Sequence, residues 1–455
     1  MGIGTRSLRP SAEPTSGSYS TGLGTRADVV TYLTLWVVLL YGIYARQVVP
    51  GLGAIGTPAL LLALPTLMFW VAGWVAPHYG LSRDRHPIRA ALFVYLCFHL
   101  LSFSVASSRP LTSLESTGSA RALLTTVAMV GIALLAADGI ANSPRLEALL
   151  RRVVYAGGFL GLYGLAQYLT RQPLLFLLPG LTWNADPRDL ASRGVEVRPA
   201  GTALHPIEFG VVTGALVPLA IHFALYAPSK RQRAAAAAAG GFLVLGMPLA
   251  ASRSGIVSVV VGLLILFTGW RGRRLLNGLL AVCVTVPIIW ATVPGVVGTM
   301  FGLFTDTGDD ISIQARLNRV PRIMALIRER PLLGLGSGTW SIEDYFLIDN
   351  ELFVTTLESG LVGLTITVAL LVGAVVLCLC LRNLVLDDRT RHLVLALGAS
   401  IAGLTVSLAT FDSFHYHILT GTLFLLVGTA GALWRIHRGS ELASMRWRAG
   451  RMHRG

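Results

Sequence analysis

The chain has 455 residues, of which 53% are hydrophobic and only 13% are charged. Soluble globular proteins carry about twice that share of charged residues, so the composition excludes an ordinary soluble domain and predicts an integral membrane protein. The net charge of +14 comes almost entirely from arginine, since Lys230 is the only lysine, and in membrane proteins arginines gather on the cytoplasmic side of the spans without indicating nucleic-acid binding.

The N-terminal segment, residues 1–27, is rich in Gly, Ser and Thr and has no apolar run. This composition is typical of disorder, and we expect a disordered cytoplasmic tail. The first apolar run is too long for a cleaved signal peptide, and no Ala-x-Ala-like site follows it.

Apolar runs then dominate residues 28–436. A membrane-spanning helix needs about 20 mostly apolar residues. Runs of this kind occupy residues 28–48, 56–76, 89–106, 122–141, 153–170, 207–226, 234–251, 255–270, 275–297, 361–381, 392–411 and 416–436. The predicted fold is therefore an all-α polytopic membrane domain of about 12 transmembrane helices.

Arginine clusters set the orientation of these helices. With the N-terminus inside, every inner connection carries basic residues, for example residues 83–89, 145–152 and 230–233. This alternation follows the positive-inside rule. It predicts a multi-pass protein of the cytoplasmic (inner) membrane with both termini in the cytoplasm, ending in a basic tail, residues 437–455.

Two long outer loops, about 171–206 and 298–350, are also rich in arginine, and we expect short helices within them. Membrane insertion does not require these arginines, because the rule weakens for long loops. Arginines clustered on the outer face suit a polyanion such as a phosphate or diphosphate.

Five arginines are candidate diphosphate ligands. Arg198 precedes the sixth helix, and Arg253 lies between two serines at a tight outer turn. Arg316, Arg319 and Arg322 recur at helical spacing, which predicts an amphipathic helix on the membrane surface. The alternatives are that Arg198 only extends to lipid head groups and that Arg319 and Arg322 bind head groups as well.

Four acid–base groups accompany them. Asp349 and Glu358 lie at the far end of the second loop and could accept a proton from a sugar hydroxyl, or pair with arginine for structure. His205 could act as a proton acceptor or as a helix cap. Glu208 is costly in a membrane helix, and we expect it to pair with an outer-loop arginine. Further groups of the last outer turn could line the same pocket: Asp412, His415 and His417.

Four motifs in order resemble the family of O-antigen ligases and O-antigen polymerases, which are bacterial polytopic glycosyltransferases. They are Arg198-Pro-Ala-Gly201, Ser252-Arg253-Ser-Gly255, Arg316 ahead of Pro331-Leu-Leu-Gly-Leu-Gly336, and Asp349-Asn350 through Glu358-Ser-Gly360-Leu-Val-Gly363. The similarity covers about residues 190–385. Ligases of this family typically carry a His-Asn pair where this chain has Asp349-Asn350.

The resemblance implies an inverting transfer or polymerisation of a polyprenyl-diphosphate-linked glycan onto a sugar hydroxyl at the outer face of the membrane. The partners would be the lipid-linked donor, a glycan or lipid-glycan acceptor, and membrane lipids. It implies no metal, nucleotide sugar or other cofactor, and the outer loops lack an Asp-x-Asp motif and a His/Cys ligand cluster. Asp349 would take the role of the family histidine, with Glu358 or His205 as alternatives.

Two other classes are weighed against this enzyme. A transporter of a lipid-linked sugar or small anion would place charges near the bilayer midplane and show two matching halves. This chain concentrates its ionisable residues in two outer loops. A scaffolding protein would not need the observed arginine spacing. We therefore favour the enzyme.

Overall fold

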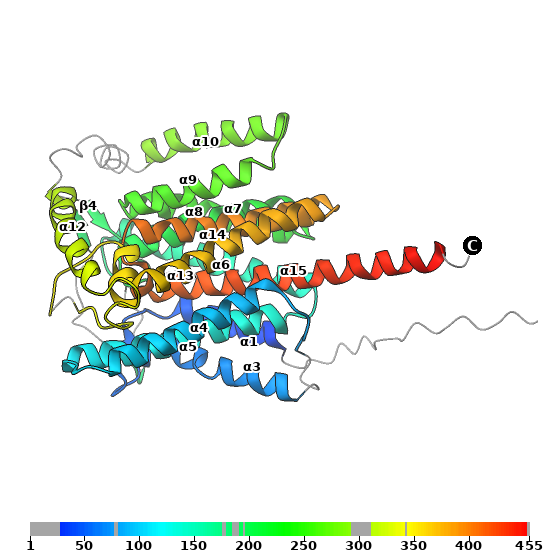
Figure 1. The fold of residues 1–455 in the computed structure, drawn as a ribbon. Coiled ribbons are helices and arrows are strands. Elements are labelled where there is room, and N and C mark those ends of the chain that lie inside the picture. The colour runs from blue at the N-terminus through cyan, green and yellow to red at the C-terminus, as the bar shows by residue number, and fades with distance from the viewer. Residues whose placement is uncertain are drawn as a thin grey trace, which may run out of the picture.

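The computed structural model describes residues 28–76, 81–174, 179–183, 191–193, 196–292, 311–341 and 344–452. The predicted tail of residues 1–27 and the start of the second outer loop, residues 298–310, lie outside this set. The fold is all-α, as predicted, and long helices lie side by side along one axis (Figure 1).

The helices are α1 (Val29–Gly42), α2 (Pro58–Ala63), α3 (Thr66–Val75), α4 (Pro87–Ser107), α5 (Ser113–Gly139), α6 (Ser143–Thr170), α7 (Pro206–Tyr226), α8 (Lys230–Leu249), α9 (Arg253–Phe267), α10 (Arg273–Thr292), α12 (Ile311–Glu329), α13 (Glu351–Leu384), α14 (Asp388–Val406) and α15 (His417–Met452). Among the described residues, the strands form two short antiparallel pairs: β1 (Gln47–Val48) with β2 (Thr182–Trp183), and β3 (Ala191–Arg193) with β4 (Glu196–Arg198).

Every predicted apolar run contains a helix within its described residues, although the first run, 28–48, ends in non-helical chain that includes β1. The run at residues 56–76 is divided into α2 and α3 at Pro65, a residue that cannot donate the hydrogen bond of a continuous helix. Within the described residues, seven helices are long and apolar enough to cross a membrane, with α2 and α3 counted as one, and α1 and α9 are shorter apolar helices. The membrane class is confirmed, and the count of about 12 spans stays a prediction.

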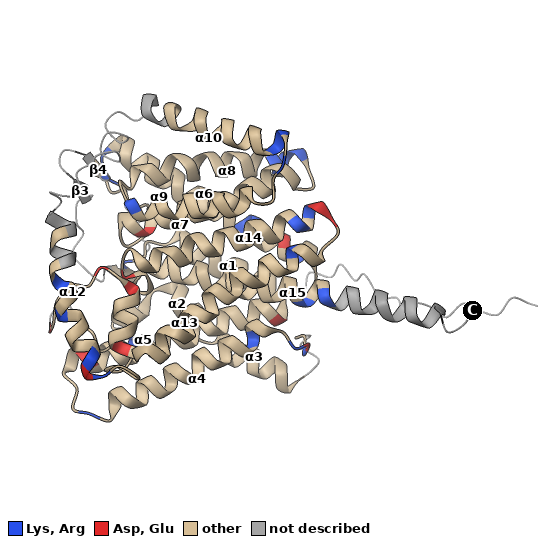
Figure 2. Ribbon diagram, turned by 45° about the horizontal axis from the view of Figure 1, so that its top comes forward, with Lys and Arg blue, Asp and Glu red and all other residues tan. Residues whose placement is uncertain are grey.

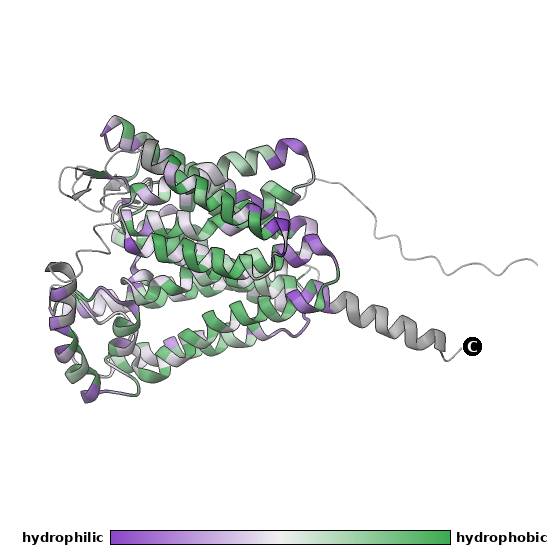
Figure 3. Cartoon of the chain, turned by 90° about the horizontal axis from the view of Figure 1, so that it is seen from above, coloured by the Kyte–Doolittle hydropathy of each residue, from purple (hydrophilic) through white to green (hydrophobic). Residues whose placement is uncertain are grey.

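The most buried helices form the centre of the bundle. In the most apolar 18-residue stretch of each helix, 78% of the residues are buried in α7 and α14 and 89% in α15, whereas only 33% are buried in α4. Hydrophobic residues predominate along the middle of the helices, and the most hydrophilic residues lie mainly at their ends (Figure 3). The exposed apolar side chains of the outer helices therefore form the surface that faces lipid.

One end of the bundle, which we call the basic end, gathers the arginines near the start of α6, α8, α10 and α14 (Figure 2). Ion pairs join its segments, including Arg145 with Asp28 and Arg389 with Glu147. This grouping agrees with the predicted alternation of basic clusters. The predicted basic tail continues α15 as helix to Met452.

The opposite end, which we call the loop end, contains the segments 43–57 and 407–416 and the described parts of the segments 171–205 and 331–350. The Ala45 amide donates to the Thr202 carbonyl at 2.9 Å, and Asn350 Nδ2 donates to the Ala409 carbonyl at 3.0 Å. Helix α12 crosses the ends of the bundle helices there (Figure 1), as predicted for the second loop. The described part of the first loop contains the strands β2–β4 and no helix, because Thr and Val alternating with polar residues favour extended chain.

Helix α13 is interrupted at Gly360, whose φ of 65° and ψ of −175° are not helical. The segment Pro331–Gly336 lies against the interruption. Four backbone hydrogen bonds join the two: from the amides of Leu335 and Gly336 to the carbonyls of Leu357 and Glu358 at 2.9 and 2.7 Å, and from the amides of Leu361 and Val362 to the carbonyls of Pro331 and Leu332 at 2.8 and 3.3 Å. These bonds satisfy backbone groups that the interrupted helix leaves without intrahelical partners.

We predict that Gly360→Ala destabilises the protein by about 1–3 kcal/mol, because only glycine adopts this conformation readily and an added Cβ would lie 2.0 Å from the Leu332 carbonyl oxygen. The measurement is the midpoint of thermal unfolding in detergent. Gly373→Ala is the matched control, since this glycine of the same helix has no atom within 4 Å of the added Cβ. Equal midpoints for the two variants would contradict the role of the interruption.

Candidate functional site

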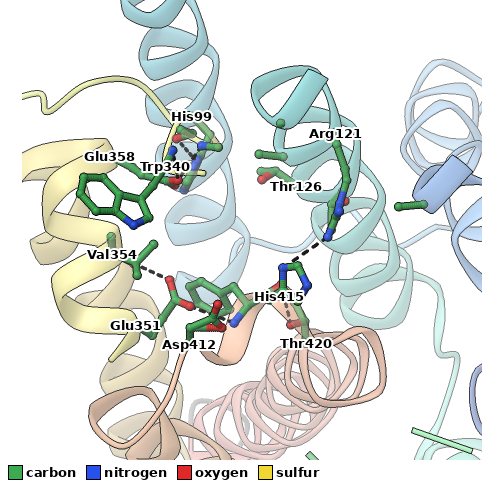
Figure 4. A pocket seen from close by; sticks show the side chains of 18 of the residues that line it. His99, Arg121, Thr126, Trp340, Glu351, Val354, Glu358, Asp412, His415 and Thr420 are labelled. Carbon is green, nitrogen blue, oxygen red and sulfur yellow. Dashed lines mark hydrogen bonds between the residues drawn. The ribbon is translucent and has the colours of Figure 1, made fainter. Parts of the chain in front are cut away.

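A cavity of about 640 Å³ lies at the loop end, between α4, α5, α13 and the connection from α14 to α15 (Figure 4). Its size is that of a small-molecule site. The acidic and basic side chains that line it are Arg121, Glu351, Glu358, Asp412, His99, His415 and His417. Asp412, His415 and His417 of the predicted last outer turn thus line one cavity with Glu358, whereas the described lining includes none of the five predicted diphosphate arginines.

Glu358 fixes one wall of the cavity. Its carboxylate accepts hydrogen bonds from the amides of Gly338 at 2.8 Å and Trp340 at 3.1 Å, one to each oxygen. The intervening turn is held further by Ser337 Oγ, which lies 3.0 Å from His99 Nδ1. Because a buried carboxylate needs such donors, Glu358 holds the turn that follows Pro331–Gly336.

Glu351 fixes the neighbouring wall. It begins α13 directly after Asn350, whose Oδ1 caps the helix by accepting from the amide of Leu352 at 2.9 Å. The Glu351 carboxylate accepts from the Phe414 amide and from Thr355 Oγ1, both at 2.9 Å. The start of α13 is thereby tied to the 407–416 segment, which carries Asp412 and His415.

Asp412 differs from these glutamates. Its Oδ1 is buried and has no hydrogen-bond partner among the described residues. Burial, together with the charges of Asp349 and Glu358, raises the pKa of Asp412 to about 7, and Arg121 opposes the shift. Asp412 therefore exchanges a proton near neutral pH, as expected of a general acid or base.

Arg121 and His415 face each other across the same cavity (Figure 4). Arg121 Nη2 lies 3.4 Å from His415 Nδ1. Burial and the arginine charge lower the pKa of His415 to about 4, so this imidazole is neutral at pH 7. Arg121 is the only arginine or lysine among the described residues that line the cavity.

Two further predicted acid–base groups, His205 and Asp349, are not part of the described cavity lining. His205 caps α7, with its Nδ1 accepting from the Ile207 amide at 3.1 Å, and its ring centroid lies 6.2 Å from that of Tyr416. Burial and the charges of Arg198 and Arg46 lower the pKa of His205 to about 4, and Asp349 opposes this shift. Asp349 therefore acts electrostatically on both His205 and Asp412.

Two predicted diphosphate ligands meet at the turn between α8 and α9. Arg198 Nε donates to the Ala250 carbonyl at 2.9 Å, and Arg253 is the first residue of α9. Ala251 between them has a left-handed φ of 43°. Arg198 of the first resemblance motif thus contacts the turn that leads into the second motif, and the role of both arginines as diphosphate ligands stays a prediction.

The arginines of α12 contact the second loop. Arg319 donates to the Leu347 carbonyl at 3.0 Å, and the Arg322 guanidinium lies 4.7 Å from the centroid of the Phe346 ring. These contacts stabilise the segment that leads to Asp349. Arg316 belongs to the same helix, and its side chain lies outside the described set.

The predicted ion pair of Glu208 is wrong. In the described chain the Glu208 carboxylate accepts from the backbone amides of Leu204, Ile418 and Leu419, at 2.9, 2.8 and 3.2 Å. The first amides of a helix lack intrahelical partners, and Glu208 supplies acceptors for the start of α15 in place of an arginine contact.

Sequence reasoning missed Arg121 as a site residue, because the predicted span began at residue 122. The helix begins at Ser113, where Thr112 and Glu115 form a capping box. The pattern Thr-x-x-Glu before an apolar run is a signal for a helix start. With that start, Arg121 lies within a membrane helix, where an ionisable residue suggests function.

No group of three His, Cys, Asp or Glu side chains suited to a metal ion occurs in the described part of the chain. The groups that the site offers are instead guanidinium groups, carboxylates and neutral imidazoles, which bind anions and transfer protons.

We predict that Glu358→Gln destabilises the protein by about 1–3 kcal/mol, because the new amide nitrogen cannot accept one of the two backbone N–H bonds, leaving a buried donor without a partner. Thermal unfolding in detergent measures the effect. Glu329→Gln, at an exposed position of α12, is the control. An unchanged midpoint in Glu358→Gln would show that Glu358 does not hold this turn.

Comparison with known families gives one match. Residues 238–368 match the family model described as O-antigen ligase. The matched stretch runs from α8 into α13 and includes Arg253, Arg316 and Glu358. No curated protein matches the chain. The resemblance found in the sequence is thus confirmed for this stretch, whereas α4, α5 and the α14–α15 connection, which complete the cavity, lie outside it.

Proposed function

We propose that this integral membrane protein, whose residues 238–368 match the O-antigen ligase family model, transfers or polymerises a polyprenyl-diphosphate-linked glycan onto a sugar hydroxyl. The loop end would face outward from the cytoplasmic membrane. The observation that carries the proposal is the loop-end cavity, which is lined by both Asp412 and Arg121. Asp412 Oδ1 is buried and has no hydrogen-bond partner among the described residues. The family match supports glycan transfer in general.

The diphosphate would bind on the arginine side of the loop end. Arg198 and Arg253 meet at the α8–α9 turn, and Arg316 lies on α12, which crosses the same end. When the glycan leaves the diphosphate, negative charge develops on the phosphate oxygens. Positioned guanidinium groups stabilise that charge, and this stabilisation does not require a metal ion.

The acceptor hydroxyl would lose its proton on the cavity side. Its oxygen attacks the anomeric carbon, the bond from that carbon to the diphosphate oxygen breaks, and the bonding electrons leave with the diphosphate. The hydroxyl proton passes to a carboxylate. One displacement of this kind inverts the anomeric configuration.

Asp412 is the carboxylate that best suits this role. Both oxygens of Glu358 already accept backbone N–H groups, and Nδ1 of His205 caps α7. Asp349 has its own contacts at the border of the site and raises the pKa of Asp412. We therefore assign proton acceptance to Asp412 and electrostatic tuning to Asp349.

We predict that Arg198→Ala and Arg253→Ala each lower turnover about 100- to 1000-fold, the usual loss when one charge-stabilising donor is removed. The assay uses protein in detergent with EDTA and a polyprenyl-diphosphate oligosaccharide, and it measures released polyprenyl diphosphate and lengthened glycan. Arg273→Ala, at the basic end, is the control. If wild type binds the lipid without turnover while liposomes that contain the protein move solute, a transporter takes the place of the enzyme.

We predict that wild-type turnover rises with pH through about 7, because the carboxylate of Asp412 must be ionised to accept a proton and its pKa is raised to about 7. Asp412→Asn should abolish turnover. Asp349→Asn removes a neighbouring negative charge, so the pKa of Asp412 should fall and the midpoint of the pH profile should move to lower pH. Loss of turnover in Asp349→Asn with full turnover in Asp412→Asn would reverse the two roles.

A further inference from the structure

A second cavity, of about 350 Å³, lies at the basic end, away from the proposed reaction site. It is formed by two turns, one between α9 and α10 and the other between α13 and α14. Its lining consists of Gly269, Arg271, Arg382, Asn383 and Arg391. Three guanidinium groups thus surround one hollow.

Contacts between helices hold the two turns in place. Trp270 Nε1 donates to His392 Nε2 at 3.0 Å, which fixes the first turn to α14. The Arg382 guanidinium donates to Oγ1 and the carbonyl of Thr268, both at 3.3 Å, which fixes the end of α13 to the same turn. At Gly269 a Cβ would lie 2.3 Å from Leu395 Cδ2, so this turn packs closely against α14. The hollow is therefore built into the fold.

The positive charge of this cavity is only partly balanced. Arg391 pairs with Asp388 at 3.0 Å. The contacts of Arg382 go to neutral groups of Thr268, and Arg271 is exposed without a hydrogen bond or ion pair within the described residues. Asp387 accepts from the amide and hydroxyl of Thr390.

The other nearby carboxylate, Glu147, pairs with Arg389. Two guanidinium groups of the lining, those of Arg271 and Arg382, thus remain without a carboxylate partner among the described residues. A phosphate oxygen is a strong acceptor for such groups.

Exposed apolar side chains flank the cavity. Leu386 is 90% exposed and Leu384 44% exposed at the α13–α14 turn, and the first turns of α10 expose Leu276, Leu279 and Leu280 at 55%, 46% and 52%. A free phosphate ion would leave these apolar side chains exposed, whereas the acyl chains of a bound lipid would cover them. Basic pockets between membrane helices bind phosphate-bearing head groups in this way.

We propose that the cavity lined by Arg271, Arg382 and Arg391 binds the phosphate head group of an anionic membrane phospholipid, with its acyl chains along α10. The head group bridges the α9–α10 and α13–α14 turns. This site lies at the end of the bundle opposite to glycan transfer, and the inference does not depend on the proposed activity.

The test uses the full-length protein, delipidated in mild detergent and titrated with phosphatidylglycerol or phosphatidylcholine, with bound lipid counted by native mass spectrometry. Phosphatidylglycerol should bind, and Arg271→Gln should weaken that binding about fivefold, the contribution of one basic residue to an anionic lipid surface. Arg271 has no partner to lose within the described residues, so this variant should fold. Arg231→Gln, exposed at the start of α8 at the same end, should bind as wild type does.

If Arg231→Gln and Arg271→Gln weaken phosphatidylglycerol binding equally, the lipid is attracted by the charge of the whole basic end, and the proposal of a specific site is wrong. Equal binding of phosphatidylcholine would also overturn it. Inorganic phosphate at millimolar concentration tests the alternative ligand. The lipid assignment is wrong, and the ligand is a free anion, if phosphate displaces phosphatidylglycerol and also raises the thermal stability of wild type as much as the lipid does. In that case phosphate should not stabilise Arg271→Gln.

Discussion

The backbone pairing between Pro331–Gly336 and the interrupted helix α13 is the interaction on which the loop end depends. At Gly360 the helix leaves backbone amides and carbonyls without intrahelical partners, and a buried group left in that state costs about 1–3 kcal/mol. The paired segment supplies their partners. It also delivers the following turn, whose amides bind Glu358. The hydrogen bonds that satisfy the backbone groups at this helix interruption therefore also determine the position of the cavity wall.

Buried carboxylates join the remaining segments of the loop end. Glu208, Glu351 and Glu358 each accept backbone N–H groups from a segment distant in sequence. Such bonds offset the cost of burying a carboxylate. Asp412 keeps an oxygen without a partner in the described chain and titrates near neutrality, since burial raises its pKa to about 7. A perturbed carboxylate in a cavity, among others engaged in structure, is the one expected to do chemistry.

Hydropathy predicted the helices because an apolar run of about 20 residues is a local signal. The grouping of basic clusters at one end followed from arginine alternation for the same reason. The site was less predictable, because its contacts are not local. The sequence identified Glu358 as a candidate site residue, but it could not predict the amides that Glu358 binds, because the fold brings them together. Arg121 was missed because the predicted span began after it, and the interruption at Gly360 was hidden because the predicted span began at residue 361, beyond the break.

The central claim is that glycan transfer takes place at the loop-end cavity. Its most direct test is a cryo-electron microscopy structure of the protein in lipid nanodiscs with a non-transferable polyprenyl-diphosphate glycan analogue. The account predicts the diphosphate at Arg198 and Arg253 and the glycan beside Asp412 and Arg121. Density for the analogue at the basic end, or along the bundle axis between α7 and α15 near the midplane, would contradict it.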